Sequence, residues 1–120
     1  MSQALKDRTK KFAVDVWLLC SKIPKSREFN NYVNQLLRCS SSVAANYRAA
    51  MRAKSNADFI NKLKIVEEEA DESQFFLELL QTIYKDESTK AELERLLNEI
   101  DQLLAITVAS LKTARTNFNR

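Results

Sequence analysis

The sequence predicts an all-α fold, an up-down-up-down antiparallel four-helix bundle that forms one domain over residues 1–120. Three observations lead to this prediction. Glycine is absent, proline occurs once, at Pro24, and apolar residues recur about every 3.6 positions along four segments. Sheets joined by tight turns usually need glycine at positive φ, so its absence argues against a β-fold. Helices of about 20 to 30 residues with short connections pack as antiparallel neighbours, which makes a bundle the economical arrangement.

The first two predicted helices cover about residues 4–23 and 27–53. Pro24 separates them, because the residue before a proline avoids the α region. The apolar stripe of the first helix consists of Leu5, Phe12, Val16, Leu19 and Ile23. The stripe of the second helix consists of Phe29, Tyr32, Val33, Leu36, Leu37, Val43, Ala44, Tyr47 and Met51.

The third and fourth predicted helices cover about residues 56–84 and 89–116. Ser55, with Asp58 three positions later, resembles a capping box and predicts the start of the third helix. Its apolar spacing continues from Phe59 to Tyr84. The tract KDES predicts a turn, with Ser88 as the N-cap of the fourth helix. That helix has leucines and isoleucine at helical spacing from Leu93 to Leu111.

Two of these helices carry large apolar side chains outside their core stripes. These side chains are Val14, Trp17 and Leu18 in the first helix and Phe75 and Leu79 in the third. A helix that is apolar all round is normally buried all round, and large exposed apolar patches usually mark contacts. We therefore expect these five residues to form a homo-oligomer interface. Irregular packing inside one bundle is the alternative.

Charge is distributed unevenly along the chain. The 19 basic minus 16 acidic side chains give a net charge of only +3. Residues 25–54, however, hold six cations and one anion, whereas residues 55–84 hold two cations and seven anions. The two segments should attract one another or face different partners.

The sequence offers no catalytic constellation, no metal site and no cofactor site. Histidine is absent, which removes the commonest general base and imidazole ligand. The carboxylates of residues 67–72 point to several sides of a helix, so we interpret them as a solvated or ion-paired face. Cys20 and Cys39 lack paired spacing and suit a reducing compartment. Residues 1–12 lack the apolar core of a secretion signal, and no apolar run is long enough to span a bilayer. We expect a cytoplasmic protein with no membrane partner.

Four arginines form a strip along the second predicted helix. At 100° per residue, Arg27, Arg38, Arg48 and Arg52 fall within an arc of about 80°. Ser41 and Ala45 lie in the same strip, and no aromatic side chain is interleaved for stacking bases. The arginines could bind successive phosphates of a nucleic acid. They could equally pair with acids of the third helix, for which the wheel indicates Glu67, Asp71 or Glu78. Spacing alone favours the second interpretation.

Several segments together resemble a known family. They are VW at 16–17, IPKSREF at 23–29, QLLRCSSSVAANYRAA at 35–50 and KSNADFINKLKIVEEEADESQFFLELL at 54–80. The chain resembles the four-helix bundle proteins encoded in intervening sequences of bacterial large-subunit ribosomal RNA genes, often labelled ribosomal protein-like. The most specific part is the pattern Gln35, Arg38, Ser42 and Asn46, followed by Ser55, Phe59 and Leu63. Many relatives continue Asn-Ile-Ala-Glu-Gly, whereas this chain reads Asn46-Tyr47-Arg48-Ala49-Ala50.

The resemblance implies a protein that is not an enzyme. The family is similar to the accessory variability determinant of diversity-generating retroelements, a pentameric bundle that binds nucleic acid and a reverse transcriptase. By that likeness we expect a ring-shaped homo-oligomer, most simply a homopentamer, that binds RNA or DNA as an accessory protein. It adds Arg38 as a binding residue and a reverse transcriptase as a candidate protein partner. The alternative is a structural or protein–protein interaction module that binds no nucleic acid.

Overall fold

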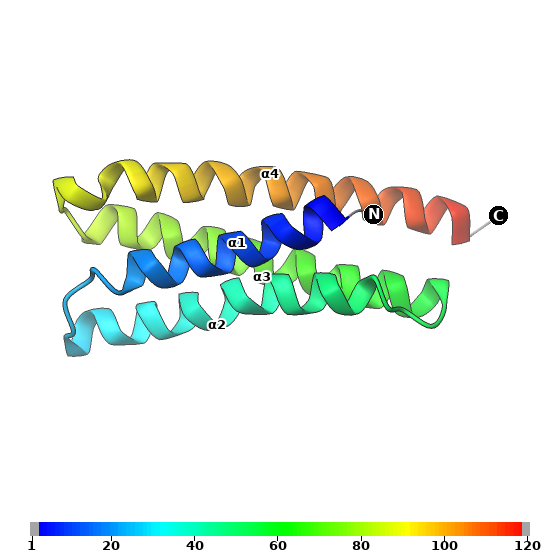
Figure 1. Cartoon of the computed structure of the whole chain (residues 1–120), viewed down its shortest axis with the longest axis horizontal. Helices are drawn as coiled ribbons and strands as arrows, with labels where there is room; N and C mark the ends of the chain where they lie inside the picture. The colour runs from blue at the N-terminus through cyan, green and yellow to red at the C-terminus, as the bar shows by residue number, and fades with distance from the viewer. Residues whose placement is uncertain (1–2, 119–120) are drawn as a thin grey trace.

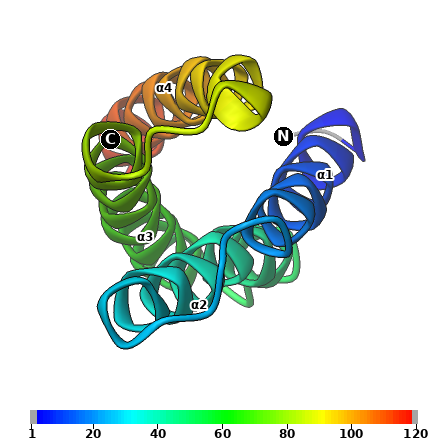
Figure 2. The same ribbon diagram turned by 90° about the vertical axis from the view of Figure 1, so that its left-hand side faces the viewer.

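The computed structural model describes residues 3–118 as four α-helices in sequence. They are α1 (Gln3–Cys20), α2 (Arg27–Ala50), α3 (Asn56–Ile83) and α4 (Glu87–Phe118). Each helix packs against the next, and α1 also packs against α4, so the four form a closed cycle of neighbours (Figures 1 and 2). No strand occurs among the described residues. The predicted all-α four-helix bundle is confirmed.

One apolar core runs between the four helices. Phe12 and Leu19 of α1 meet Leu36 of α2 and Leu77 of α3, and all of these side chains are fully buried. The stripe of α4, with Leu93, Leu96, Ile100 and Leu111, completes the core. These are the positions that the 3.6-residue spacing selects, because one face of each amphipathic helix turns inward. Within residues 3–118, none of the helices combines the length and apolar character needed to cross a bilayer.

Serine and aspartate side chains set the helix starts. The Ser26 hydroxyl accepts from the Phe29 N–H at 3.0 Å, and the Ser55 hydroxyl accepts from the Asp58 N–H at 3.1 Å. The predicted cap at Ser55 is therefore present. The predicted cap at Ser88 is wrong, because α4 begins at Glu87 and the Asp86 carboxylate accepts from the Ser88 N–H at 3.0 Å. An aspartate one residue before the helix satisfies that free N–H as a serine would.

Helices α1 and α2 each end three residues before the predicted boundary, at Cys20 and Ala50 rather than at residues 23 and 53. In both places the backbone continues as a tighter turn. The Ile23 N–H donates to the Cys20 carbonyl, and the Ala53 N–H donates to the Ala50 carbonyl, both at 3.1 Å. These bonds span three residues instead of four, which is how a last turn often tightens. The remaining differences are small, since α3 ends at Ile83 and α4 at Phe118.

Ion pairs join α1 to α4. The Arg8 Nη2 lies 2.6 Å from a Glu99 oxygen, and the Arg95 Nη2 lies 2.8 Å from Asp15 Oδ2. Lys11, one turn before Asp15, also donates to Asp15 Oδ2, at 2.7 Å.

Helix α1 has 18 residues and α4 has 32, so α1 does not reach the end of the bundle where α4 terminates (Figure 1). At that end the molecule consists of α2, α3, α4 and the α2–α3 connection.

Candidate nucleic-acid interface

The four predicted arginines are all exposed, and the structure divides them into three environments. Arg27 lies in the first turn of α2, where its Nη2 pairs with the neighbouring Glu28 at 3.1 Å. Arg38 lies in the middle of α2, and Arg48 and Arg52 lie at its far end. At a rise of about 1.5 Å per residue, Arg27 and Arg48 are roughly 30 Å apart along the helix. The strip therefore extends along most of α2 and through three different surroundings.

Arg38 connects α2 to α3. Its Nη2 donates to Glu72 at 2.6 Å, and its Nη1 donates to Glu69 at 3.3 Å. The hydrogen bond to Glu72 and the charges of both carboxylates raise the pKa of the Arg38 guanidinium. The acids are not those that the helical wheel indicated, which were Glu67, Asp71 and Glu78. Arg38 is thus engaged by the bundle itself, as the ion-pair interpretation predicts for this position.

The family-specific residues of α2 form a polar row beside this ion pair. The Arg38 Nε donates to the Gln35 side-chain oxygen at 3.5 Å. One and two turns further on, the Asn46 amide donates to the Ser42 hydroxyl at 2.9 Å and to its carbonyl at 3.0 Å. Gln35, Ser42 and Asn46 are half-buried. The hydrogen bonds of these three residues lie within α2, and Arg38 alone extends the row to α3 through its ion pairs.

Arg48 and Arg52 lie together in a shallow hollow of about 720 Å³ at the α2–α3 end of the bundle, which we call the basic hollow. It is lined by Ala45, Arg48, Ala49, Arg52, Lys54, Asp58 and Lys62. Four of these seven side chains are cationic and one is acidic. Among residues 3–118, neither Arg48 nor Arg52 forms an ion pair, and the Asp58 carboxylate accepts from the Lys54 backbone N–H at 3.2 Å. Positive charge is concentrated here without the carboxylates that neutralise Arg38.

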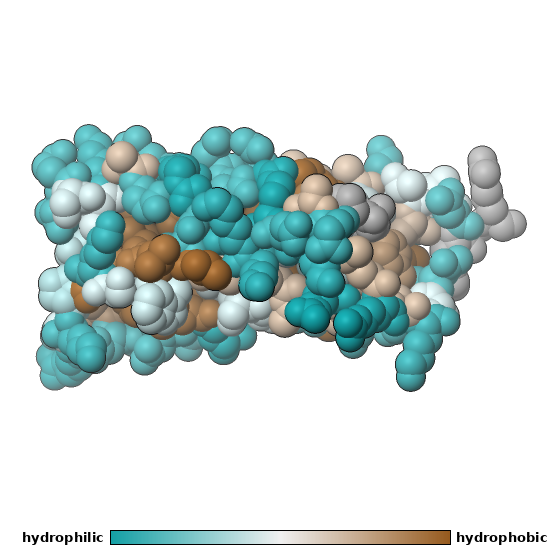
Figure 3. All heavy atoms as spheres, in the orientation of Figure 1, coloured by the Kyte–Doolittle hydropathy of each residue, from teal (hydrophilic) through white to brown (hydrophobic). Residues whose placement is uncertain are grey.

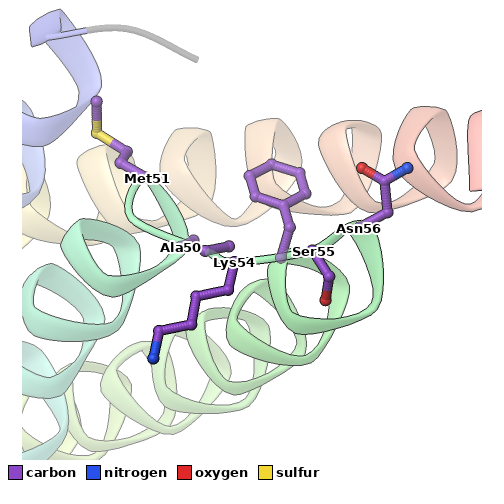
Figure 4. A pocket seen from close by; sticks show the side chains of 7 residues that line it. Ala50, Met51, Lys54, Ser55 and Asn56 are labelled. Carbon is purple, nitrogen blue, oxygen red and sulfur yellow. The ribbon is translucent and has the colours of Figure 1, made fainter.

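Two cations of the basic hollow, Lys54 and Lys62, are absent from the predicted site. Lys54 lies in the connection after α2, and Figure 4 shows its side chain extending away from Met51. Lys62 lies on α3, one turn after Asp58. A wheel drawn for one helix cannot include either residue. The sequence did hold a signal for Lys62, which follows Asp58 by four residues in the first turns after the Ser55 cap. Because the connection from α2 is short, a cation in these turns lies near the end of α2.

The basic hollow offers charge but no aromatic surface. None of its lining residues is aromatic, and Phe59, which lines the neighbouring pocket at the α2–α3 connection, is half-buried. Ala45 and Ala49 are small, so an extended phosphate backbone could approach α2 closely between the two arginines. Stacking of unpaired bases needs exposed rings, whereas phosphate binding needs cations alone. The geometry fits contact with the backbone of a nucleic acid.

The two cysteines provide no nucleophile. Burial raises the pKa of the Cys20 thiol to about 12, and the nearby Cys39 adds to this effect. Burial also raises the pKa of Cys39, whose sulfur lies 3.3 Å from the Ser73 hydroxyl. Because the thiolate is the reactive form, both groups are inert at neutral pH. Among residues 3–118, no group of three or more acids and cysteines is placed to hold a metal ion.

The predicted interface residues lie on two opposite sides of the bundle. On α1, Val14, Trp17 and Leu18 are 49%, 60% and 47% exposed, and on α3 Phe75 is 56% exposed. Leu79 is half-buried beside Phe75. Helices α1 and α3 are not backbone neighbours and lie diagonally across the bundle, with their core side chains between them (Figure 2). These residues therefore form two separate surfaces rather than one.

Comparisons with known proteins agree with this architecture. The model of the family described as 23S rRNA-intervening sequence protein matches residues 3–106. The chain is similar to a crystal structure from Bacteroides thetaiotaomicron VPI-5482, described as a protein with unknown function from the S23 ribosomal protein family. The two are 33% identical with a TM-score of 0.78, over 91% of this chain and 96% of that chain. A search among curated proteins finds no match.

Proposed function

The chain belongs to the 23S rRNA-intervening sequence protein family, and from this membership we propose a nucleic-acid-binding accessory protein without catalytic activity. In this proposal the protein acts in the cytoplasm as a ring-shaped homo-oligomer, most simply a homopentamer. Its ligand is RNA or DNA, bound through the phosphate backbone at the basic hollow. A second protein, such as a reverse transcriptase, would bind the assembled ring.

The basic hollow is the observation that carries the proposal. Arg48 lies in the last turn of α2 and Arg52 in the tighter turn that follows it, and Lys54 and Lys62 line the same hollow from the connection and from α3. Each guanidinium can donate two parallel hydrogen bonds to one phosphate. The described residues place no ion-pairing carboxylate on either arginine. Cations without internal partners can displace the counterions that are condensed on a nucleic acid. The release of these counterions is the main source of affinity for a phosphate backbone.

Arg38 favours the alternative function for the middle of α2. Its two ion pairs with Glu69 and Glu72 occupy the guanidinium at the surface between α2 and α3. If all basic residues were engaged in this way, the protein would be a structural or protein–protein interaction module. We therefore assign phosphate binding to Arg48 and Arg52, and helix packing to Arg38. This division makes the two functions separable by mutation.

A binding experiment with matched charge variants tests the proposal. Protein freed of copurifying nucleic acid is titrated with a ribosomal RNA fragment and with duplex DNA at about 0.1 M salt. At this salt one duplex phosphate contact contributes roughly eightfold in affinity, so Arg48→Gln with Arg52→Gln should weaken binding by up to about 60-fold. Lys85→Gln with Lys90→Gln removes two charges from exposed positions at the α3–α4 end of the bundle, opposite the basic hollow, and serves as the control (Figure 1). We expect the control to lose less than about threefold, as for distant charges screened by salt.

Two outcomes would contradict phosphate binding at the basic hollow. An equal loss in both double variants would show that only net charge matters. A loss of thermal stability in the Arg48→Gln, Arg52→Gln variant without a loss of affinity would show that the arginines serve the fold. The proposed self-association is tested separately by light scattering. A mass near 13.8 kDa for the wild type at micromolar concentration would contradict it.

A further inference from the structure

We infer that the outer faces of α1 and α3 are the two complementary halves of one contact, so that α1 of one copy packs on α3 of the next. The α1 face comprises Val14, Trp17 and Leu18, and the α3 face comprises Phe75, Leu79 and Ile83. This inference rests on the self-association proposed above. It does not depend on nucleic-acid binding.

The α1 face is an apolar patch with a basic surround. Figure 3 shows hydrophobic side chains gathered over the C-terminal half of α1 within a hydrophilic surface. The exposed charged residues of this side are three lysines and one acid, namely Lys10, Lys11, Lys22 and Asp7. Beside Trp17 a hollow of about 560 Å³ opens between the end of α1 and the start of α2. Its lining combines apolar side chains such as Ile23, Pro24 and Val33 with polar ones, namely Ser21, Lys25, Asn30 and Asn34.

The α3 face is an apolar patch with an acidic surround. Phe75 and Ile83 are exposed and Leu79 is half-buried between them. Phe75 stands edge-on against Phe76, with ring centroids 5.2 Å apart, which holds its ring in place. Three exposed carboxylates frame the patch, and none of them forms an ion pair within residues 3–118. They are Glu68, Asp71 and Glu78.

Charge complementarity identifies a second copy of this chain as the occupant. Pairing α1 with α1 would bring lysines together, and pairing α3 with α3 would bring carboxylates together. In the α1–α3 pairing the two apolar patches meet and the charges around them are opposite in sign. The same charges disfavour the α1–α1 and α3–α3 pairings. With their charged surrounds the two faces have comparable lengths, because residues 10–20 of α1 and 68–83 of α3 span about 15 and 22 Å of helix.

One chain cannot make this contact with itself. Helices α1 and α3 lie diagonally across the bundle, and their outer faces point to opposite sides of it. Each copy that joins through its α1 face therefore still presents a free α3 face. Head-to-tail contacts of this kind generate a closed ring when the rotation between copies closes. The arrangement supplies a physical reason for a ring rather than a two-fold dimer.

Two single variants and their mixture test the pairing. Trp17→Glu places a carboxylate opposite the acidic surround of α3, and Phe75→Lys places an ammonium group opposite the basic surround of α1. Each variant alone should be a monomer of 13.8 kDa by light scattering. Mixed one to one, they should form a dimer of twice that mass, because the first retains an intact α3 face and the second an intact α1 face. Both positions are exposed, so circular dichroism should show unchanged helix content.

Val108→Glu provides the matched control, since Val108 is an exposed apolar residue of α4 outside both faces. This variant should keep the mass of the wild type. Pairing of like faces would instead leave each single variant associated through its unmodified face, and mixing would add no new species. That result, or a mixture that stays monomeric, would overturn the inference. Binding by the basic hollow is measured through Arg48 and Arg52, so its failure is distinguishable from failure here.

Discussion

Replacing Asp15 by Asn tests how α1 is held against α4. Asp15 Oδ2 accepts from Lys11 at 2.7 Å and from Arg95 at 2.8 Å, and its side chain is only 12% exposed. Both cations are largely in solvent, so they stay hydrated when the carboxylate is removed. The cost should therefore be far below the roughly 3–5 kcal/mol of a broken buried ion pair. Two exposed ion pairs that each contribute near the upper end of the usual range should together add about 1–2 kcal/mol to the free energy of unfolding.

This loss is large enough to measure by thermal unfolding. At about 2.1 cal/mol/K per residue, a chain of this length has an unfolding entropy near 0.25 kcal/mol/K, so 1 kcal/mol corresponds to about 4 °C. Asp15→Asn should lower the Tm at pH 7 by about 4–8 °C. Asp7→Asn is the matched control, because Asp7 is an exposed carboxylate of the same helix that accepts only from Gln3 among the described residues. Its Tm should change by less than about 2 °C.

The pH dependence separates charge from packing. Burial raises the pKa of Asp15, but hydrogen bonds from Lys11 and Arg95 outweigh this effect, and the net pKa lies below its usual value of 3.8. A lowered folded-state pKa stabilises the fold above the unfolded-state pKa, and the stabilisation is lost as pH falls through the folded-state value. The deficit of Asp15→Asn should be full at pH 7 and shrink below about pH 4. An equal deficit at pH 7 and pH 3, or none at pH 7, would refute this reasoning.

Three further predictions follow from other contacts. Leu77 is fully buried, and Leu77→Ala should cost about 2–5 kcal/mol, seen as a lower urea midpoint with an unchanged m-value; a cost below about 1 kcal/mol would contradict the packed core. Because burial raises the pKa of Cys20 to about 12 and also raises that of Cys39, neither thiol should react with a water-soluble disulfide at pH 8 until urea is added; fast labelling of the native protein would argue against their burial. Arg38→Gln should lower the Tm and leave the salt dependence of nucleic-acid binding unchanged, and a flatter salt dependence would mean that Arg38 binds phosphate as well.

The sequence predicts the four helices well because each must turn one apolar stripe toward the core. The helix ends are harder to predict, as α1 and α2 show. The apolar spacing continues to Ile23, which is buried, although the hydrogen bonds change from four-residue to three-residue spans after Ser21. The turn after α1 thus keeps Ile23 on the core side of the bundle, and the turn after α2 leaves Ala53 half-buried. Hydrophobic spacing therefore cannot distinguish the end of an α-helix from a tighter turn that continues it.

The candidate site is predictable within one helix and not between helices. A wheel places the arginines of α2 on one strip, but the rotation of α3 about its own axis decides which acids they meet. Packing of Tyr32 against Phe76, with ring centroids 6.4 Å apart, occurs on the same flank of α3 that presents Glu69 and Glu72 to Arg38. Lys62 joins the basic hollow from a segment of net negative charge. The net charge of a segment therefore does not predict the position of a single cation such as Lys62.

The salt dependence of nucleic-acid affinity tests the central claim, phosphate binding by Arg48 and Arg52, most directly. The association constant for a duplex is measured from about 0.05 to 0.3 M salt for the wild type and for Arg48→Gln with Arg52→Gln. Each lost duplex contact should reduce the log–log slope by about 0.9, so the double variant should be flatter by up to about 1.8 units, with a nearly unchanged Tm. Equal slopes for the two proteins, with a clearly lower Tm for the variant, would contradict phosphate binding at the basic hollow.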